Sequence, residues 1–123
     1  MKILTIMTRI YSENRDTTVR FYETLTGQTC SLRFAMPDAG LELAQVGTFL
    51  IIAGSEDALK PFRSTTATFL VDSVEEYFHF FTRNNIAIIR PPRPVPTGVN
   101  MTIQHPEGTI IEYVQHRPLP KTP

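Results

Sequence analysis

Apolar and polar residues alternate at the start of the chain, and the spacing then becomes helical. Residues 3–11 predict a strand whose two faces differ in polarity. The apolar face comprises Leu4, Ile6 and Ile10. The more polar face comprises Thr5, Met7 and Arg9. Residues 17–27 predict a helix, which Asp16 would cap at its N-terminus and Gly27 would end.

The rest of the chain predicts short strands around a second helix. Residues 74–84 have apolar side chains at positions i, i+3, i+4 and i+7, and Ser73 with Glu76 predicts a capping box before them. Residues 91–98, with the sequence PPRPVPTG, predict a loop. The predicted strands after the first one lie at residues 29–34, 41–46, 48–53, 66–72, 86–90, 99–104 and 109–115.

The same order of elements, a strand, a helix and three strands, occurs twice. The two halves match by eye at an offset that drifts only from 59 to 61 residues. This match sets Met7 against Thr66 and Ile51 against Glu112. A self-match that persists through three elements predicts two related modules.

Composition excludes several classes of protein. The 123 residues contain 12 Lys and Arg against 12 Asp and Glu, which argues against nucleic-acid binding through bulk charge. The single cysteine, Cys30, allows neither an intrachain disulfide nor a cysteine-based zinc site, which favours a reducing, cytoplasmic location. No segment approaches the roughly 20 apolar residues of a membrane span, so no membrane partner is expected.

Four motifs carry a resemblance to a known family: RFYETLTG, TATFLVDSVEEYFHFF, PPRPVPTG and IQHPEGTIIEYVQ. On these motifs the chain resembles the vicinal oxygen chelate superfamily, the group of glyoxalases, bleomycin-resistance proteins and extradiol dioxygenases. His105 stands where the family usually has Asp. The resemblance covers residues 3–116 and implies an α+β fold of two βαβββ modules, whose strands form an open, cupped, mixed β-sheet barrel. It also implies a homodimer.

The expected organisation is one domain over residues 1–116. The modules would span about residues 1–60 and 61–116, and a proline-rich tail, residues 117–123, would be extended and poorly ordered. A ferredoxin-like dimeric barrel is an alternative fold. It needs only four strands and two helices, and it leaves the hairpin at residues 41–53 unexplained.

The resemblance also bears on metal binding. Metal-using members place His in the first strand, His or Gln at the opening of the second module, and Glu in the last strand. The corresponding positions here are Met7, Thr66 and Glu112. A thioether and a hydroxyl are poor ligands for such ions, so we expect no metal and no other cofactor. The histidines, at positions 79, 105 and 116, have no metal-ligand spacing.

Strand parity predicts which residues would face the cavity and which would face the helices. The helix side would comprise Leu4, Ile6, Ile10, Ala67, Phe69 and Val71. The expected ligand-binding residues are Met7, Arg9, Thr66, Thr68, Asn100, Thr102 and Glu112. Gln104 shares this face by the family's register. A simpler reading is that these strands face water on one side and that Glu112 is a structural carboxylate paired with Arg9 or with the threonines.

The function that this combination favours is binding of a small organic molecule without a metal, as the drug-resistance members do. Glu112 would accept a hydrogen bond from a ligand hydroxyl or amine, and Arg9 could hold a ligand carboxylate. One alternative is an enzyme, a lyase, isomerase or dioxygenase-type protein in which Glu112 is the general base or a metal ligand. Another is a family member whose dimer is purely structural.

Overall fold

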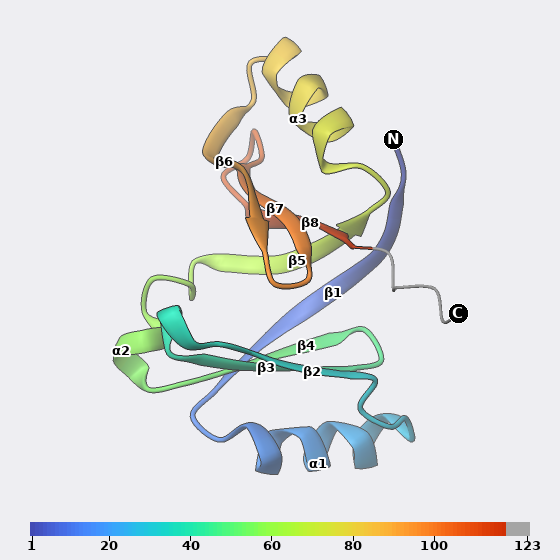
Figure 1. The fold of residues 1–123 in the computed structure, drawn as a ribbon, viewed down its shortest axis with the longest axis vertical. Helices are drawn as coiled ribbons and strands as arrows, with labels where there is room; N and C mark the ends of the chain where they lie inside the picture. The colour runs from blue at the N-terminus through green and yellow to red at the C-terminus, as the bar shows by residue number, and fades with distance from the viewer. Residues whose placement is uncertain (118–123) are drawn as a thin grey trace, which may run out of the picture. The chain divides into compact units, whose positions relative to one another are not determined.

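The computed structural model describes residues 1–117, which divide into two compact units (Figure 1). The N-terminal unit comprises residues 6–68, and the C-terminal unit comprises residues 1–5 and the chain from residue 69 onward. Strands β1 (Ile3–Ser12) and β5 (Thr65–Val71) each contribute to both units. The proline-rich tail expected beyond Arg117 lies outside the described residues. Over residues 1–117, every helix is too short or too polar to cross a bilayer.

The N-terminal unit is a four-stranded mixed sheet with one long helix. Its strands follow the order β2-β3-β4-β1, in which β1 is parallel to β4 and the other pairs are antiparallel. Helix α1 packs against β3 and β4 (Figure 1). The elements after β1 are α1 (Arg15–Thr26), β2 (Leu32–Met36), a 3-10 turn (Pro37–Ala39), β3 (Leu41–Val46), β4 (Phe49–Ala53) and α2 (Glu56–Leu59).

Helix α1 begins two residues earlier than the sequence predicts. Asn14, not Asp16, is its N-cap, because the Asn14 side chain accepts a hydrogen bond from the backbone N–H of Thr17 at 3.0 Å. Asp16 lies in the first turn, where its carboxylate pairs with Arg33 at 3.3 Å. The predicted end is confirmed: Gly27 adopts a left-handed conformation, with φ of 70°.

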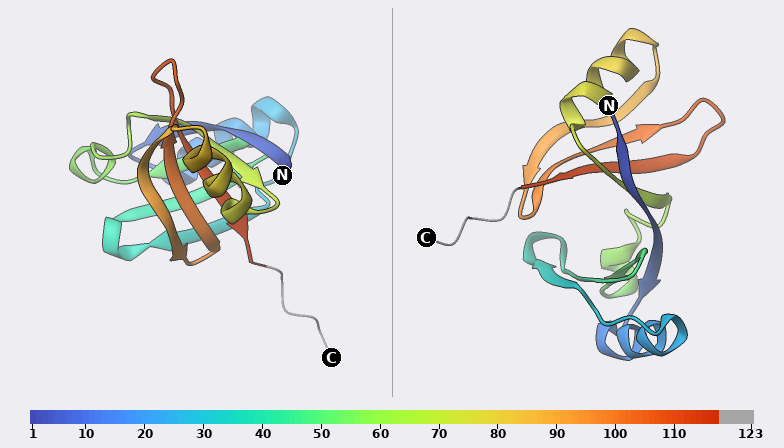
Figure 2. Two further views of the ribbon diagram at one scale, coloured as in Figure 1. Left: turned by 90° about the horizontal axis from the view of Figure 1, so that it is seen from above. Right: turned by 90° about the vertical axis from the view of Figure 1, so that its right-hand side faces the viewer.

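The C-terminal unit repeats this plan. Its strands follow the order β5-β8-β7-β6, and α3 packs against β6, β7 and β8 (Figure 2). Ser73 caps α3 as predicted, by accepting from the Glu76 N–H at 3.2 Å. The rings of Tyr77 and Phe81 on α3 contact that of Tyr113, with centroids 5.5 and 5.2 Å apart. The elements after β5 are α3 (Val74–Arg83), β6 (Ala87–Val95), β7 (Gly98–Gln104) and β8 (Ile110–His116).

The predicted loop at residues 91–98 is wrong over residues 91–95, because β6 continues through Pro91, Pro92 and Pro94 to Val95, and the turn comprises residues 96 and 97. Strand β6 is the last strand in its order, and its pairing with β7 is irregular on both sides of Arg90. Proline has no N–H to donate to a neighbouring strand, and sheets tolerate it at an edge or a bulge. Arg90 therefore lies inside a strand and in register with Thr102.

Two expectations about strand faces also need correction. Leu4 and Ile6 do not meet the helices: they are 51% and 55% exposed, because α1 packs against β3 and β4 instead. The match between Ile51 and Glu112 is displaced by one residue. Ile51 packs with Val19 of α1, whereas Glu112 adjoins Tyr113, which packs against α3, and so points to the other face of its sheet.

Candidate functional site

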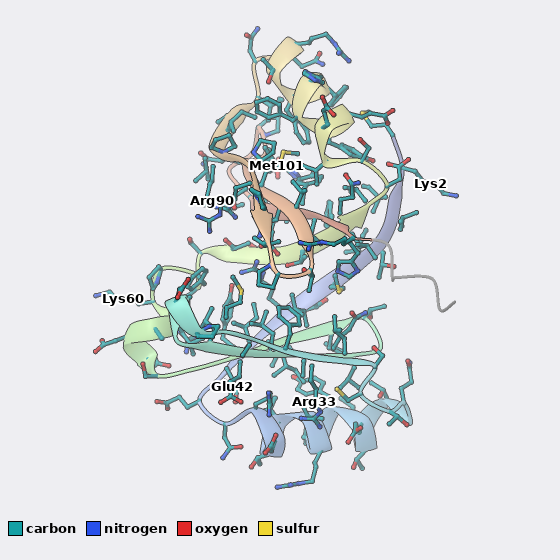
Figure 3. All side chains as sticks on the ribbon, in the orientation of Figure 1. Lys2, Arg33, Glu42, Lys60, Arg90 and Met101 are labelled. Carbon is teal, nitrogen blue, oxygen red and sulfur yellow. The ribbon has the colours of Figure 1, made fainter. Side chains whose placement is uncertain are left out.

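Polar side chains gather on the face of β6, β7 and β8 that is opposite α3. Thr102 on β7 is directly opposite Glu112 on β8, and Asn100 lies on the same face as Thr102. The alternating residues Met101 and Tyr113 are buried on the α3 side. We call Arg90, Asn100, Thr102 and Glu112 the Glu112 cluster; Figure 3 labels Arg90 and Met101.

Directed hydrogen bonds connect the members of the Glu112 cluster. The Arg90 guanidinium donates from Nη1 to Asn100 Oδ1 at 2.7 Å and from Nη2 to Thr102 Oγ1 at 3.1 Å. Asn100 Nδ2 then donates to Glu112 Oε2 at 2.8 Å. Asn100 is only 5% exposed, so its amide links a cation to an anion in a largely dry environment. Three predicted site residues, Asn100, Thr102 and Glu112, thus share one face.

His116 ends β8 on the same face as Glu112. Burial lowers the pKa of its imidazole below the usual value of 6.5, and the negative charge of Glu112 acts in the opposite direction. The lowered pKa favours the neutral form of the imidazole. Sequence reasoning did not select His116, although its parity with Glu112 would have indicated it.

A second polar network belongs to the N-terminal unit. Arg9 donates from Nε to Thr68 Oγ1 at 2.9 Å and from Nη1 to the Tyr11 hydroxyl at 3.0 Å. The Tyr11 hydroxyl in turn lies against two backbone carbonyl oxygens, that of Phe62 and, at 2.7 Å, that of Thr65. The network brings together two predicted site residues, Arg9 and Thr68, and adds Tyr11, which has the same strand parity as Arg9.

The other two predicted residues of this unit differ in exposure. Met7 is 2% exposed and contributes apolar surface on the Arg9 side of β1. Thr66 is exposed, unlike Thr68, its neighbour on the same face, which is 1% exposed. Within residues 1–117, no three His, Cys, Asp or Glu side chains lie close enough together to hold a metal ion.

A buried tyrosine and a histidine pair on the other face of the C-terminal sheet. His105 Nε2 lies 2.7 Å from the hydroxyl of Tyr113, and burial raises the pKa of Tyr113 to about 12. A shallow surface pocket of about 340 Å³ adjoins His105 and is lined also by Gln104 and Pro106. Because it lies at the end of β7 rather than on the polar face, this pocket is distinct from the Glu112 cluster.

No family model matches the chain, and no curated protein matches it significantly. Solved structures do match. An uncharacterized protein from Methanosarcina mazei is 50% identical, with a TM-score of 0.92, over 98% of this chain and 98% of that one. Methylmalonyl-CoA epimerase from Mycobacterium tuberculosis is 15% identical, with a TM-score of 0.75, over 94% of this chain and 90% of that one. The Streptomyces coelicolor methylmalonyl-CoA epimerase, in complex with 2-nitronate-propionyl-CoA, is 16% identical, with a TM-score of 0.75, over 95% of this chain and 100% of that one.

The two epimerases are similar to this chain in fold, and at 15% and 16% identity the likeness carries nothing more. Methylmalonyl-CoA epimerase is a vicinal oxygen chelate protein. The predicted α+β fold class, with a strand, a helix and three strands repeated, is confirmed. Since half of its residues are identical over nearly the whole length of both chains, this protein belongs to the same family as the uncharacterized protein from Methanosarcina mazei.

Proposed function

We propose that this protein is a cytoplasmic, metal-free member of the vicinal oxygen chelate superfamily that binds a small organic molecule. The observation that carries the proposal is the Glu112 cluster. In it a half-buried carboxylate accepts a hydrogen bond from Asn100, a partner that is itself 5% exposed. Burying a carboxylate or an amide costs free energy unless each group has a hydrogen-bond partner. A sheet face that only contacts water would gain no stability from burying these groups, so the arrangement favours a ligand-binding face.

The chemistry of the cluster indicates what the ligand offers to it. A carboxylate is only an acceptor, so Glu112 would bind a hydroxyl or, more strongly, a protonated amine. Arg90 donates to Asn100 and to Thr102. The enzyme alternative uses the same carboxylate as a general base, and the hydrogen bonds of the cluster do not favour it over binding.

Four further residues are proposed as ligand contacts in the N-terminal unit. Arg9, held by Thr68 and Tyr11, has the rigid fork that suits a ligand carboxylate. Thr68 would contribute its hydroxyl. Met7 and Thr66 are proposed as lining residues on the resemblance alone.

Glu112→Gln is expected to weaken binding of an amine selectively. Three probes share one ring and differ in their polar group: benzylamine, benzyl alcohol and benzoate. At the Glu112 cluster the wild type should bind benzylamine most tightly and benzoate least, as judged from the shifted signals of the cluster residues in titrations followed by two-dimensional NMR. The Gln variant should bind benzylamine about tenfold more weakly, because a charge-assisted hydrogen bond is lost, and benzyl alcohol should be affected less.

The matched control is Glu107→Gln, which removes an exposed carboxylate from the turn between β7 and β8. It should leave all three affinities unchanged. Equal weakening by both variants, or tightest binding of benzoate at the Glu112 cluster, would contradict the role of Glu112. Stoichiometric zinc, iron, manganese or nickel in protein purified without a chelator would contradict the metal-free part of the proposal.

We also propose that the protein is a homodimer, because large apolar side chains are exposed on β1 and α1. Leu4 and Ile6 of β1 are 51% and 55% exposed, and Phe21 and Leu25 of α1 are 59% and 62% exposed. Exposed apolar patches mark association surfaces in soluble proteins.

Sedimentation equilibrium at micromolar concentration should give twice the 14.0 kDa mass of one chain. The double variant Phe21→Lys, Leu25→Lys should weaken association about tenfold or more, since it places charges in an apolar contact. Arg20→Ala, an exposed change on the same helix, is the control and should not weaken it. A monomeric wild type would contradict the proposal.

A further inference from the structure

Arg90 lies at one end of the Glu112 cluster and sets the direction of its hydrogen bonds. A guanidinium has five N–H groups and no acceptor, so every polar atom that it contacts must accept. Two of the atoms that it contacts are Asn100 Oδ1 at 2.7 Å and Thr102 Oγ1 at 3.1 Å, both on β7. The fork therefore fixes the roles of two side chains at once.

For Asn100 this contact determines which way the amide points. The oxygen lies toward Arg90 and the nitrogen lies toward Glu112, at 2.8 Å from Oε2. A rotated amide would place its N–H groups against the guanidinium and its oxygen against the carboxylate, two repulsive contacts in a site that is nearly closed to water. Arg90 and Glu112 together allow only the observed orientation.

For Thr102 the contact determines where the hydroxyl hydrogen goes. Since Thr102 Oγ1 accepts from Arg90, its own hydrogen is directed away from the guanidinium. The residue directly opposite on β8 is Glu112. Of these two side chains, Asn100 is therefore the one that donates to Glu112, whereas Thr102 accepts from Arg90.

We propose that Arg90 is a positioning residue, which orients Asn100 as a donor toward Glu112 and so holds the carboxylate for the ligand's amine or hydroxyl group. This inference rests on the proposed function, in which Glu112 is the ligand acceptor. Arg90 acts through Asn100 and need not touch the ligand. The resulting specificity is for a hydrogen-bond donor over an anion.

The test compares three variants of β6. Arg90→Met removes both donors and keeps an apolar stem, and Arg90→Lys keeps the charge on a single nitrogen that cannot reproduce the planar fork. Arg93→Met is the matched control, since Arg93 is exposed on the same strand and its loss changes the net charge equally. Thermal unfolding confirms that each variant is folded.

The first measurement needs no ligand: the side-chain amide signals of Asn100 in ¹H–¹⁵N NMR spectra. In Arg90→Met these two protons should exchange with solvent at least about tenfold faster, because the amide can rotate and open. Arg93→Met should leave them unchanged. The second measurement is the benzylamine affinity, which should fall about fivefold in Arg90→Met and partly recover in Arg90→Lys.

The outcomes separate this inference from the proposed function. Unchanged Asn100 signals in Arg90→Met would overturn the positioning role, whatever the probes do. A lower melting temperature with an unchanged benzylamine affinity would assign Arg90 a purely structural role and would also overturn it. Faster exchange of the Asn100 amide, in a protein that binds none of the three probes, would support the orientation by Arg90 while the proposed function fails.

Discussion

Gly98→Ala is expected to lower the free energy of unfolding by about 3 kcal/mol, and the melting temperature by about 10 °C. A Cβ atom at Gly98 would lie 1.9 Å from the backbone carbonyl oxygen of Gln115, and φ of Gly98 is +156°. Gly98 is in register with His116 on the neighbouring strand β8. The backbone can relieve the clash only by separating β7 from β8, and this separation would also displace Asn100, two residues further along. Urea unfolding of both proteins measures the difference.

Gly27→Ala is the control for this prediction. Gly27 also has a positive φ, +70°, but a Cβ there would meet no atom within 4 Å. Its replacement by Ala should lower the free energy of unfolding by about 1 kcal/mol, the ordinary penalty of a left-handed conformation for a residue with a side chain. A similar loss at both positions would show that the close approach to Gln115 is not the cause.

Raising the pH from 10 to 12 is expected to destabilise the fold by about 2–3 kcal/mol through Tyr113 alone. Burial raises the pKa of the folded-state hydroxyl from 10.0 to about 12. Between these values the unfolded chain loses this proton while the folded protein keeps it, so the unfolded state gains stability as the pH rises. Below pH 10 the hydroxyl is protonated in both states and contributes no pH dependence.

The check is urea unfolding of the wild type and of Tyr113→Phe at pH 9, 10, 11 and 12. The variant should be less stable below pH 10 by about 1 kcal/mol, because the hydrogen bond with His105 is lost. The variant should then lose less stability than the wild type at higher pH, so that the two curves cross before pH 12. Parallel curves across this range would contradict the raised pKa.

Regular elements could be predicted where the pattern is long and unambiguous. The alternation in β1 and the helical spacing of α3 extend over enough residues to exclude other readings. The prediction failed at β6, since prolines signal a turn in the sequence, and only the position of the strand at a sheet edge makes them compatible with pairing. Arg90 was predicted as the last residue of the strand at 86–90, and the face on which its side chain lies was not assigned.

The candidate site was only partly predictable. Parity and the family resemblance place Asn100, Thr102 and Glu112 on one face, because side chains in a strand alternate regardless of what surrounds them. The partners of Tyr11 could not be predicted in this way. They are backbone carbonyls of Phe62 and Thr65, more than 50 residues away in the chain, and their positions depend on how the segment after α2 returns to the sheet.

The prolines of β6 have a consequence for aggregation. Three of the nine residues in this edge strand, Pro91, Pro92 and Pro94, have no N–H with which to bind an incoming strand. Continuous β-addition, the geometry by which fibrils grow, is therefore blocked along this edge. Strand β2, the edge of the N-terminal unit, has no proline in its sequence LRFAM. If the protein forms fibrils under stress, β2 is the edge at which their growth begins.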